Sequence, residues 1–293
     1  MSPANDEPVP NDIFLVFQMA KVASRSWSNL LHRDFPHALV SHFHAISNKR
    51  VGQIEQLMAA QPSVQTIKHM TLPRLGRPQD EITGFVSDGR WVGPKATVVT
   101  GVRDPVARAI SAVGFLCNRL GYKPLPVTPR DGGTAENIIE VFHRALAVAR
   151  GHDTGEDTMI SLLAGIIGDF DLWFNEELYS AFDLDITTTD FDREARMLSV
   201  SGTHKVLVYR MEDLTDRVAC TRLLDTASQF LGRKLGHFPG SNTSNEARYQ
   251  SLYRQVTQSL RLPQDMLDWF YNNPTVTRFY TDEEIASFRA RWA

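Results

Sequence analysis

Strand-like apolar runs alternate along the chain with segments that carry apolar residues at helical spacing. The clearest run is Ile13 to Phe17, and related runs span 38–43, 96–100 and 205–209. A run without polar positions is typical of a strand covered on both faces, as in a parallel sheet. Helical periodicity predicts helices at 26–33, 48–60, 135–150, 158–167, 216–231, 246–260, 264–272 and 282–291, and a further helix that begins at Pro105.

Strands that alternate with helices predict an α/β fold with a mainly parallel sheet and a helical C-terminal portion. Two stretches rich in Gly, Pro and polar residues, 72–94 and 121–133, read as loops. We found no internal repeat and no linker, so residues 13–293 are expected to form one domain. Residues 1–12 are polar and contain proline, and we expect them to be a disordered leader.

Composition narrows the class of protein. Hydrophobic residues make up 42% of the 293 positions, enough for a large core, and a net charge of −3 argues against a generally basic nucleic-acid-binding protein. The two cysteines, Cys117 and Cys220, lack the spacing of a zinc site, and reduced thiols predict a cytoplasmic protein. The early apolar run is far shorter than the roughly 20 residues that span a bilayer, so no membrane span is expected.

The segment after the first strand carries candidate chemistry. Ligands of open parallel sheets bind at the carboxyl ends of strands, where helix N-termini attract anions. The segment combines small residues, hydroxyls and cations, namely Ala20, Lys21, Ala23, Ser24, Arg25 and Ser26. It contains no glycine and therefore is not a Walker A loop. The sequence leaves open a phosphate-type loop or an exposed turn that happens to hold a lysine.

A second candidate follows the strand at 96–100. Asp104 is a good N-cap and Pro105 suits the first helical position, so Arg103 lies where that strand ends. Ser111 returns to the same side of the helix and shares a face with Arg108. An arginine and a hydroxyl aimed at one place suit a phosphate monoester, although a capped surface helix would look the same.

Together these two elements resemble the sulfotransferase superfamily, whose donor is 3′-phosphoadenosine 5′-phosphosulfate (PAPS). The family's 5′-phosphosulfate loop typically reads P-K-x-G-[ST]-T, and residues 20–26 stand in its place. Its 3′-phosphate motif pairs an arginine of R-D-P-x-x-R with a serine eight residues on, as Arg103 and Ser111 do. Segments 171–186, 205–214 and 249–292 are similar to bacterial sulfotransferases described as capsular polysaccharide synthesis proteins.

The resemblance, which covers roughly residues 13–292, implies a P-loop-like three-layer fold and a sulfotransferase activity. It implies that Lys21 stabilises charge on the leaving 5′-phosphate and the transferred sulfuryl group. The residues expected to bind the donor are Lys21, Val22, Ala23, Ser24, Arg25, Ser26, Trp27, Arg103, Ser111 and Arg248. No metal is expected, and the acceptor is expected to be a hydroxyl on a carbohydrate.

The loop departs from the family pattern at three positions. Ala20, Ala23 and Arg25 stand where the family has proline, glycine and a second threonine. We expect alanine at position 23 to restrict the turn to negative φ and to hinder close backbone approach. Arg25 could add a charged contact to the 5′-phosphate or crowd it.

Several residues could act as the general base. His42 and His44 leave one strand two residues apart, so alternation places them on one side, and related sulfotransferases often carry H-x-H here. His69 is the rival, in a segment similar to the K-T-H of cytosolic sulfotransferases. A histidine base predicts activity that rises with pH near neutrality. Glu177 is the first carboxylate alternative, and with Trp173 and Phe174 it could either shape the acceptor pocket or belong to the core.

Two other functions compete with sulfuryl transfer. A P-loop-type kinase or NTPase lacks support because the chain has no G-K-[ST] in this loop and no obvious magnesium-binding acid. A non-catalytic nucleotide-binding relative stays open because Ala23 and Arg25 depart from the family pattern. The sequence leaves the acceptor's identity and the oligomeric state open.

Overall fold

The computed structural model describes residues 12–19, 21–47, 51–52, 55–56, 59, 89–119, 134–154, 157–170, 172–239 and 247–293. Its centre is a five-stranded sheet with the strand order β2-β1-β3-β5-β4. Its strands are β1 (Ile13–Phe17), β2 (Leu39–Phe43), β3 (Thr97–Val102), β4 (Met197–Ser201) and β5 (Lys205–Arg210). The pairs β1–β2, β1–β3 and β3–β5 are parallel, whereas β4 runs antiparallel to β5. The predicted α/β class with a mainly parallel sheet is confirmed.

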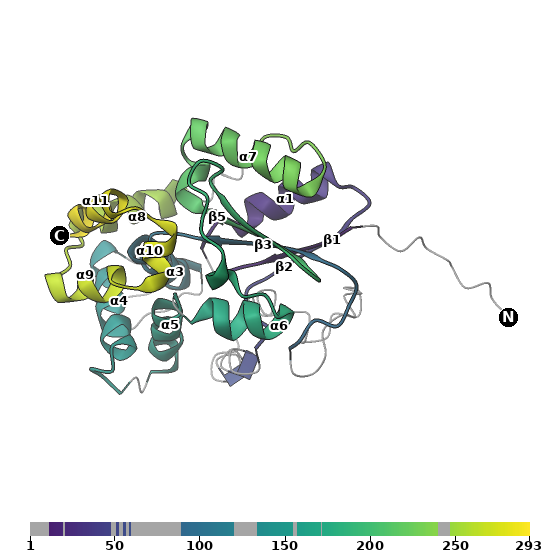
Figure 1. The fold of residues 1–293 in the computed structure, drawn as a ribbon. Coiled ribbons are helices and arrows are strands. Elements are labelled where there is room, and N and C mark those ends of the chain that lie inside the picture. The colour runs from purple at the N-terminus through teal and green to yellow at the C-terminus, as the bar shows by residue number, and fades with distance from the viewer. Residues whose placement is uncertain are drawn as a thin grey trace.

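Helices cover both faces of the sheet (Figure 1). One face carries α1 (Ser24–Asp34) and α7 (Arg217–Leu231), which pack against a core that includes Trp27 and Tyr209. The remaining helices contribute to the core on the other side of the sheet, although only some of them lie over its face (Figure 1). These are α3 (Pro105–Arg119), α4 (Ala135–Ala149), α5 (Thr158–Gly168), α6 (Ser180–Phe182), α8 (Ala247–Ser259), α9 (Gln264–Tyr271), α10 (Pro274–Phe279) and α11 (Asp282–Trp292). Within the described ranges, no helix is long and apolar enough to cross a bilayer.

The elements that the hydrophobic pattern missed have physical explanations. The edge strand β4 is half exposed and carries serines, so it lacks a continuous apolar run. Helix α10 has only six residues and depends on the Asn273 side chain, which accepts the backbone N–H of Thr275. Residues Phe174–Tyr179 form a π-helix, whose period matches neither template. Of the predicted helix 48–60, residues 51, 52, 55, 56 and 59 are described, and they are helical.

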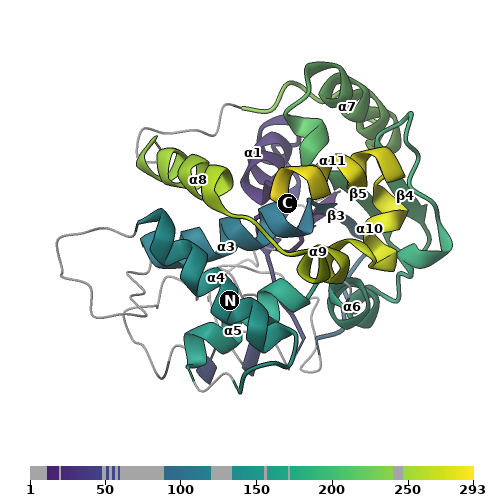
Figure 2. The ribbon, with the colours of Figure 1, turned by 90° about the vertical axis from the view of Figure 1, so that its left-hand side faces the viewer.

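The start of α3 is tied to the C-terminal helices by the buried carboxylate of Asp104. Asp104 accepts the backbone N–H of Val106 at 3.0 Å, which confirms its predicted role as N-cap. The same carboxylate accepts the Tyr271 hydroxyl at 2.7 Å and the Trp292 indole N–H at 3.0 Å. The cap therefore also anchors α9 and α11, and these helices gather beside α3 (Figure 2).

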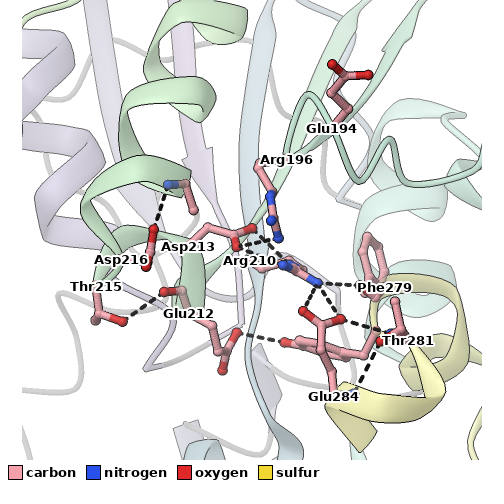
Figure 3. A network of polar contacts seen from close by, with 12 residues as sticks. Glu194, Arg196, Arg210, Glu212, Asp213, Thr215, Asp216, Phe279, Thr281 and Glu284 are labelled. Atoms are coloured by element: carbon pink, nitrogen blue, oxygen red, sulfur yellow. Dashed lines mark hydrogen bonds and ion pairs between the residues drawn. The ribbon is translucent and has the colours of Figure 1, made fainter.

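A buried arginine connects the end of β5 to α10 and α11 (Figure 3). Arg210 is 2% exposed and forms two hydrogen bonds with Asp213, at 2.7 and 2.8 Å. Its Nη1 also donates to the Glu284 carboxylate at 2.9 Å and to the Phe279 carbonyl at 3.1 Å. Removal of the arginine would leave the buried Asp213 carboxylate with only the Arg196 guanidinium, 3.5 Å away, whereas the part-exposed Glu284 would keep the Thr281 N–H.

We predict that Arg210→Met lowers the free energy of unfolding by about 3–5 kcal/mol, because breaking a buried pair leaves an uncompensated buried charge. The matched control is Arg278→Met, whose ion pair with the fully exposed Asp190 spans 3.7 Å. That variant should lose less than about 1 kcal/mol. Urea denaturation measures both losses. Equal losses in the two variants would contradict the argument.

Candidate functional site

The loop between β1 and α1 contains two residues in the left-handed conformation. Lys21 has a φ of 73°, and Ala23, the N-cap of α1, has φ 68° and ψ 32°. The expectation that alanine would hold this turn at negative φ is therefore wrong. Left-handed geometry costs an alanine about 1–2 kcal/mol, so contacts elsewhere must hold the loop in place.

Three contacts fix the carbonyl groups of this loop. Arg103 Nη1 donates to the Lys21 carbonyl at 3.2 Å, and the Tyr209 hydroxyl donates to the Val22 carbonyl. The Ala23 carbonyl accepts the N–H of Ser26 at 3.1 Å. These contacts occupy the carbonyls of residues 21–23. The loop leads directly into the N-terminus of α1, where backbone N–H groups and the helix dipole favour an anion.

The side chains of the loop divide into accessible and buried groups. Lys21 is half-buried, with its ammonium 4.6 Å from the centre of the Phe115 ring, and Arg25 is exposed. Trp27 is 0% exposed and packs against Tyr209. That side chain belongs to the core beneath α1, so only the backbone of Trp27 could take part in the predicted donor site, which stays a prediction. The Val22 side chain is buried as well, which leaves its backbone as the only part that could meet a ligand.

The predicted donor residues outside that loop are only partly brought together. Arg103 reaches it through the Lys21 carbonyl and also donates to the Tyr253 hydroxyl at 2.9 Å. Arg108 points elsewhere, because it is buried and donates to the Ile166 carbonyl of α5. The shared use of Arg108 and Ser111 toward one anion is therefore not supported. Ser111 is itself buried on α3, and its pairing with Arg103 stays a prediction.

The two histidines of the second strand do lie on one side, as alternation predicts. The ring centres of His42 and His44 are 4.7 Å apart in an edge-to-face arrangement. His44 Nδ1 lies 2.8 Å from the Gln18 carbonyl. A carbonyl only accepts hydrogen bonds, so Nδ1 carries the proton and Nε2 keeps its lone pair. This is the tautomer that a general base at Nε2 requires.

Desolvation sets the charge of this pair. Burial of the rings is the main cause that lowers the pKa of His42 to about 3 and that of His44 to about 4, and the charge of Arg25 adds to both shifts. Both imidazoles are therefore neutral near pH 7. A histidine base therefore no longer predicts activity that rises near neutral pH. It predicts a rise at more acidic pH, because both imidazoles have already lost their proton at pH 7.

Glu177 supports the histidine segment instead of facing a ligand. It is 1% exposed, and its carboxylate accepts the backbone N–H groups of Ile46 at 2.7 Å and Ser47 at 3.0 Å. Trp173 donates its indole N–H to the His44 carbonyl at 3.4 Å. Glu177 and Trp173 thus hold the chain that follows β2, and Phe174 is buried in the core.

Other sequence candidates lie outside what the structure describes. Neither Ala20 nor His69 is among the described residues, and for Arg248 only the backbone, in α8, is described. Within the described ranges, no three His, Cys, Asp or Glu side chains gather as metal ligands would. Sequence reasoning missed Gln18, Tyr209 and Tyr253. The signal for Tyr209 was its place in a buried strand, because a buried phenol needs a partner for its hydroxyl.

We predict that Ala23→Gly raises the free energy of unfolding by about 0.5–1 kcal/mol, because glycine adopts positive φ without steric strain. The control is Ala147→Gly inside α4, which should lower stability by about 1 kcal/mol. Chemical denaturation with two-state analysis measures both changes. A loss of stability in Ala23→Gly would mean that the left-handed geometry at this position is not strained.

We also predict an acid-sensitive stability that depends on the histidine pair. Between the unfolded pKa of about 6.5 and the folded pKa of about 4 for His44, the unfolded chain binds more protons than the folded one. The free energy of unfolding must therefore fall as pH falls through this window. Replacement His42→Asn should make that decline shallower, whereas His37→Asn, at an exposed side chain, should leave it unchanged. Denaturation midpoints from pH 7 to 4 test this, and identical slopes in all three proteins would refute it.

Comparison with known proteins returned no relative. No protein-family model, no curated protein and no solved structure matches the chain.

Proposed function

We propose that this protein is a sulfotransferase that moves a sulfuryl group from PAPS to an acceptor hydroxyl. The observation that carries the proposal is the loop of residues 21–23. Its Lys21 and Val22 carbonyls accept hydrogen bonds from Arg103 and Tyr209, and the loop leads directly into the N-terminus of α1. Such a loop suits a phosphate or phosphosulfate group, as the sequence motif predicts.

Donor binding would use backbone and side chains together. The loop N–H groups, with Ser24 and Ser26, would hold the 5′-phosphate, and Lys21 would neutralise the charge that develops on the leaving oxygen. Arg103 would meet the 3′-phosphate with Ser111. The Tyr253 hydroxyl, 2.9 Å from Arg103, is a further group that orients this guanidinium. No metal is part of the proposal.

Sulfuryl transfer is an in-line displacement. The acceptor oxygen bonds to sulfur while the bond from sulfur to the 5′-phosphate oxygen breaks, and the acceptor's proton goes to a base. His44 is the base we favour, because its Nδ1 is committed to the Gln18 carbonyl and its Nε2 is left with a lone pair. His42, against the same ring, would orient His44 or contact the sulfuryl group.

The acceptor, the cellular location and the competing function depend on the sequence more than on the geometry of the site. A carbohydrate acceptor, as in capsular polysaccharide sulfation, and a cytoplasmic location stay predictions of the sequence. The second candidate is a non-catalytic nucleotide-binding relative. It is favoured by the exposed Arg25, whose cation stands where the family has a threonine beside the 5′-phosphate.

Nucleotide preference tests donor identity. In a thermal-shift titration, 3′,5′-adenosine bisphosphate should stabilise the protein more than 5′-AMP does. Arg103→Ala should shrink that difference, because a charge-assisted phosphate contact contributes about 1.5–3 kcal/mol. Because the two thermal shifts are compared within one variant, any loss of stability caused by the mutation itself affects both and drops out of their difference. Arg222→Ala, an exposed arginine on α7, is the control and should keep the full difference. Equal shifts for both nucleotides in the parent protein would refute the 3′-phosphate site.

The base is tested with an acceptor found by a sugar-sulfation screen. His44→Asn should lower kcat about 10²–10⁴-fold while it still binds 3′,5′-adenosine bisphosphate. Because neutral imidazole is the active form and burial holds the pKa of His44 at about 4, kcat/KM should be level from pH 6 to 8 and fall only below about pH 5. A parent rate retained within a few-fold in His42→Asn, His44→Asn and His69→Asn would reject a histidine base. A non-catalytic relative would bind the bisphosphate and sulfate no acceptor in the screen.

A further inference from the structure

Tyr209 occupies a place prepared for it in the sheet. It lies on β5 opposite Gly101 of β3, and the two residues are register partners. A Cβ atom added at Gly101 would lie 2.6 Å from Cζ of the tyrosine ring, closer than side-chain carbons approach. The other ring neighbour is Trp27, with centres 5.2 Å apart. The glycine therefore leaves room for the ring, and the packing aims the hydroxyl at the carboxyl end of β1.

The hydroxyl of Tyr209 meets two groups there. It donates its single proton to the carbonyl of Val22 in the left-handed loop, and its oxygen lies 2.7 Å from the side-chain amide of Gln18. Because one proton cannot serve two acceptors, the –NH2 group of the Gln18 amide is assigned to face the phenol oxygen and donate to it. Gln18 and Tyr209 are both fully buried. Polar groups that are removed from water depend on such partners, since nothing else can satisfy them. The phenol is therefore fixed to the loop on one side and to Gln18 on the other.

Gln18 has a second contact through its main chain. Its carbonyl, 2.8 Å from Nδ1 of His44, determines which imidazole nitrogen carries the proton. One residue thus touches the histidine with its backbone and Tyr209 with its side chain. The result is a continuous path, Val22 to Tyr209 to Gln18 to His44, across the carboxyl ends of β1, β2 and β5.

We infer that Gln18 and Tyr209 are positioning residues that couple the conformation of the 21–23 loop to the orientation and tautomer of His44. The role of the 21–23 loop toward the donor and that of His44 toward the acceptor proton rest on the proposed function. The coupling between the loop and His44 is independent of that function. Burial raises the pKa of the Tyr209 phenol well above its usual value, so the hydroxyl remains a donor throughout the working pH range.

The first test deletes one oxygen atom with Tyr209→Phe. We expect affinity for 3′,5′-adenosine bisphosphate to fall about tenfold, the effect of one hydrogen bond that no longer holds the loop. We also expect the ¹⁵N resonances of His44 to move away from the pattern of a fully protonated Nδ1. Tyr271→Phe is the matched control, because it loses the same hydroxyl and a bond of the same 2.7 Å length, to Asp104. The control should lose comparable stability and keep the His44 signature.

The second test is a double-mutant cycle with Gln18→Met, which removes the side-chain amide but keeps the backbone carbonyl. If the two residues act as a unit, the double variant should bind the bisphosphate about as weakly as Tyr209→Phe alone. Losses that multiply, or a His44 signature unchanged in Tyr209→Phe, would overturn the inference. A parent protein that does not bind the bisphosphate would refute the proposed donor. A His44 signature that still moves with Tyr209→Phe would then support the coupling by itself.

Discussion

The position of the site depends on the parallel pairing of β1 with both of its neighbours. β1 pairs with β2 along its whole length and with β3 on its other side. Because all three strands are parallel, their carboxyl ends lie at the same edge of the sheet. This pairing brings the loop at 21–23, the histidines at the end of β2 and Arg103 after β3 to the same edge. β5 is parallel to β3 and brings Tyr209 to the same edge. Register thus gathers residues that are far apart in sequence.

The sequence predicted the parts of the site that depend on local rules. The run at Ile13–Phe17, the cap at Asp104 and the alternation of His42 with His44 each follow from neighbouring residues, and each is found in the structure. Predictions failed where distant contacts decide the outcome. Ala23 takes a left-handed conformation in a loop whose carbonyls accept hydrogen bonds from Arg103 and Tyr209. Both donors are distant in sequence, so the residues next to Ala23 do not predict this conformation.

The orientations of the Trp27 and Glu177 side chains also could not be predicted from neighbouring residues. A motif places a residue type near a ligand, but it does not say which face of the helix turns inward. Trp27 turns into the core, and Glu177 turns toward backbone N–H groups that only the fold brings to it. Both still serve the site indirectly, since one packs against Tyr209 and the other secures the chain that carries His44.

The absence of a side chain at Gly101 makes room for the Tyr209 ring, so the residue type at position 101 limits the size of the residue at position 209. With 2.6 Å between a Cβ at 101 and the tyrosine ring, even alanine there demands a smaller or displaced group at 209. A smaller group would no longer reach the β1 loop. A side chain at position 101 therefore requires a smaller group at position 209, and a tyrosine at 209 requires glycine at 101. The glycine–tyrosine pair is thus a compact signature by which remote relatives could be recognised when overall sequence similarity has faded.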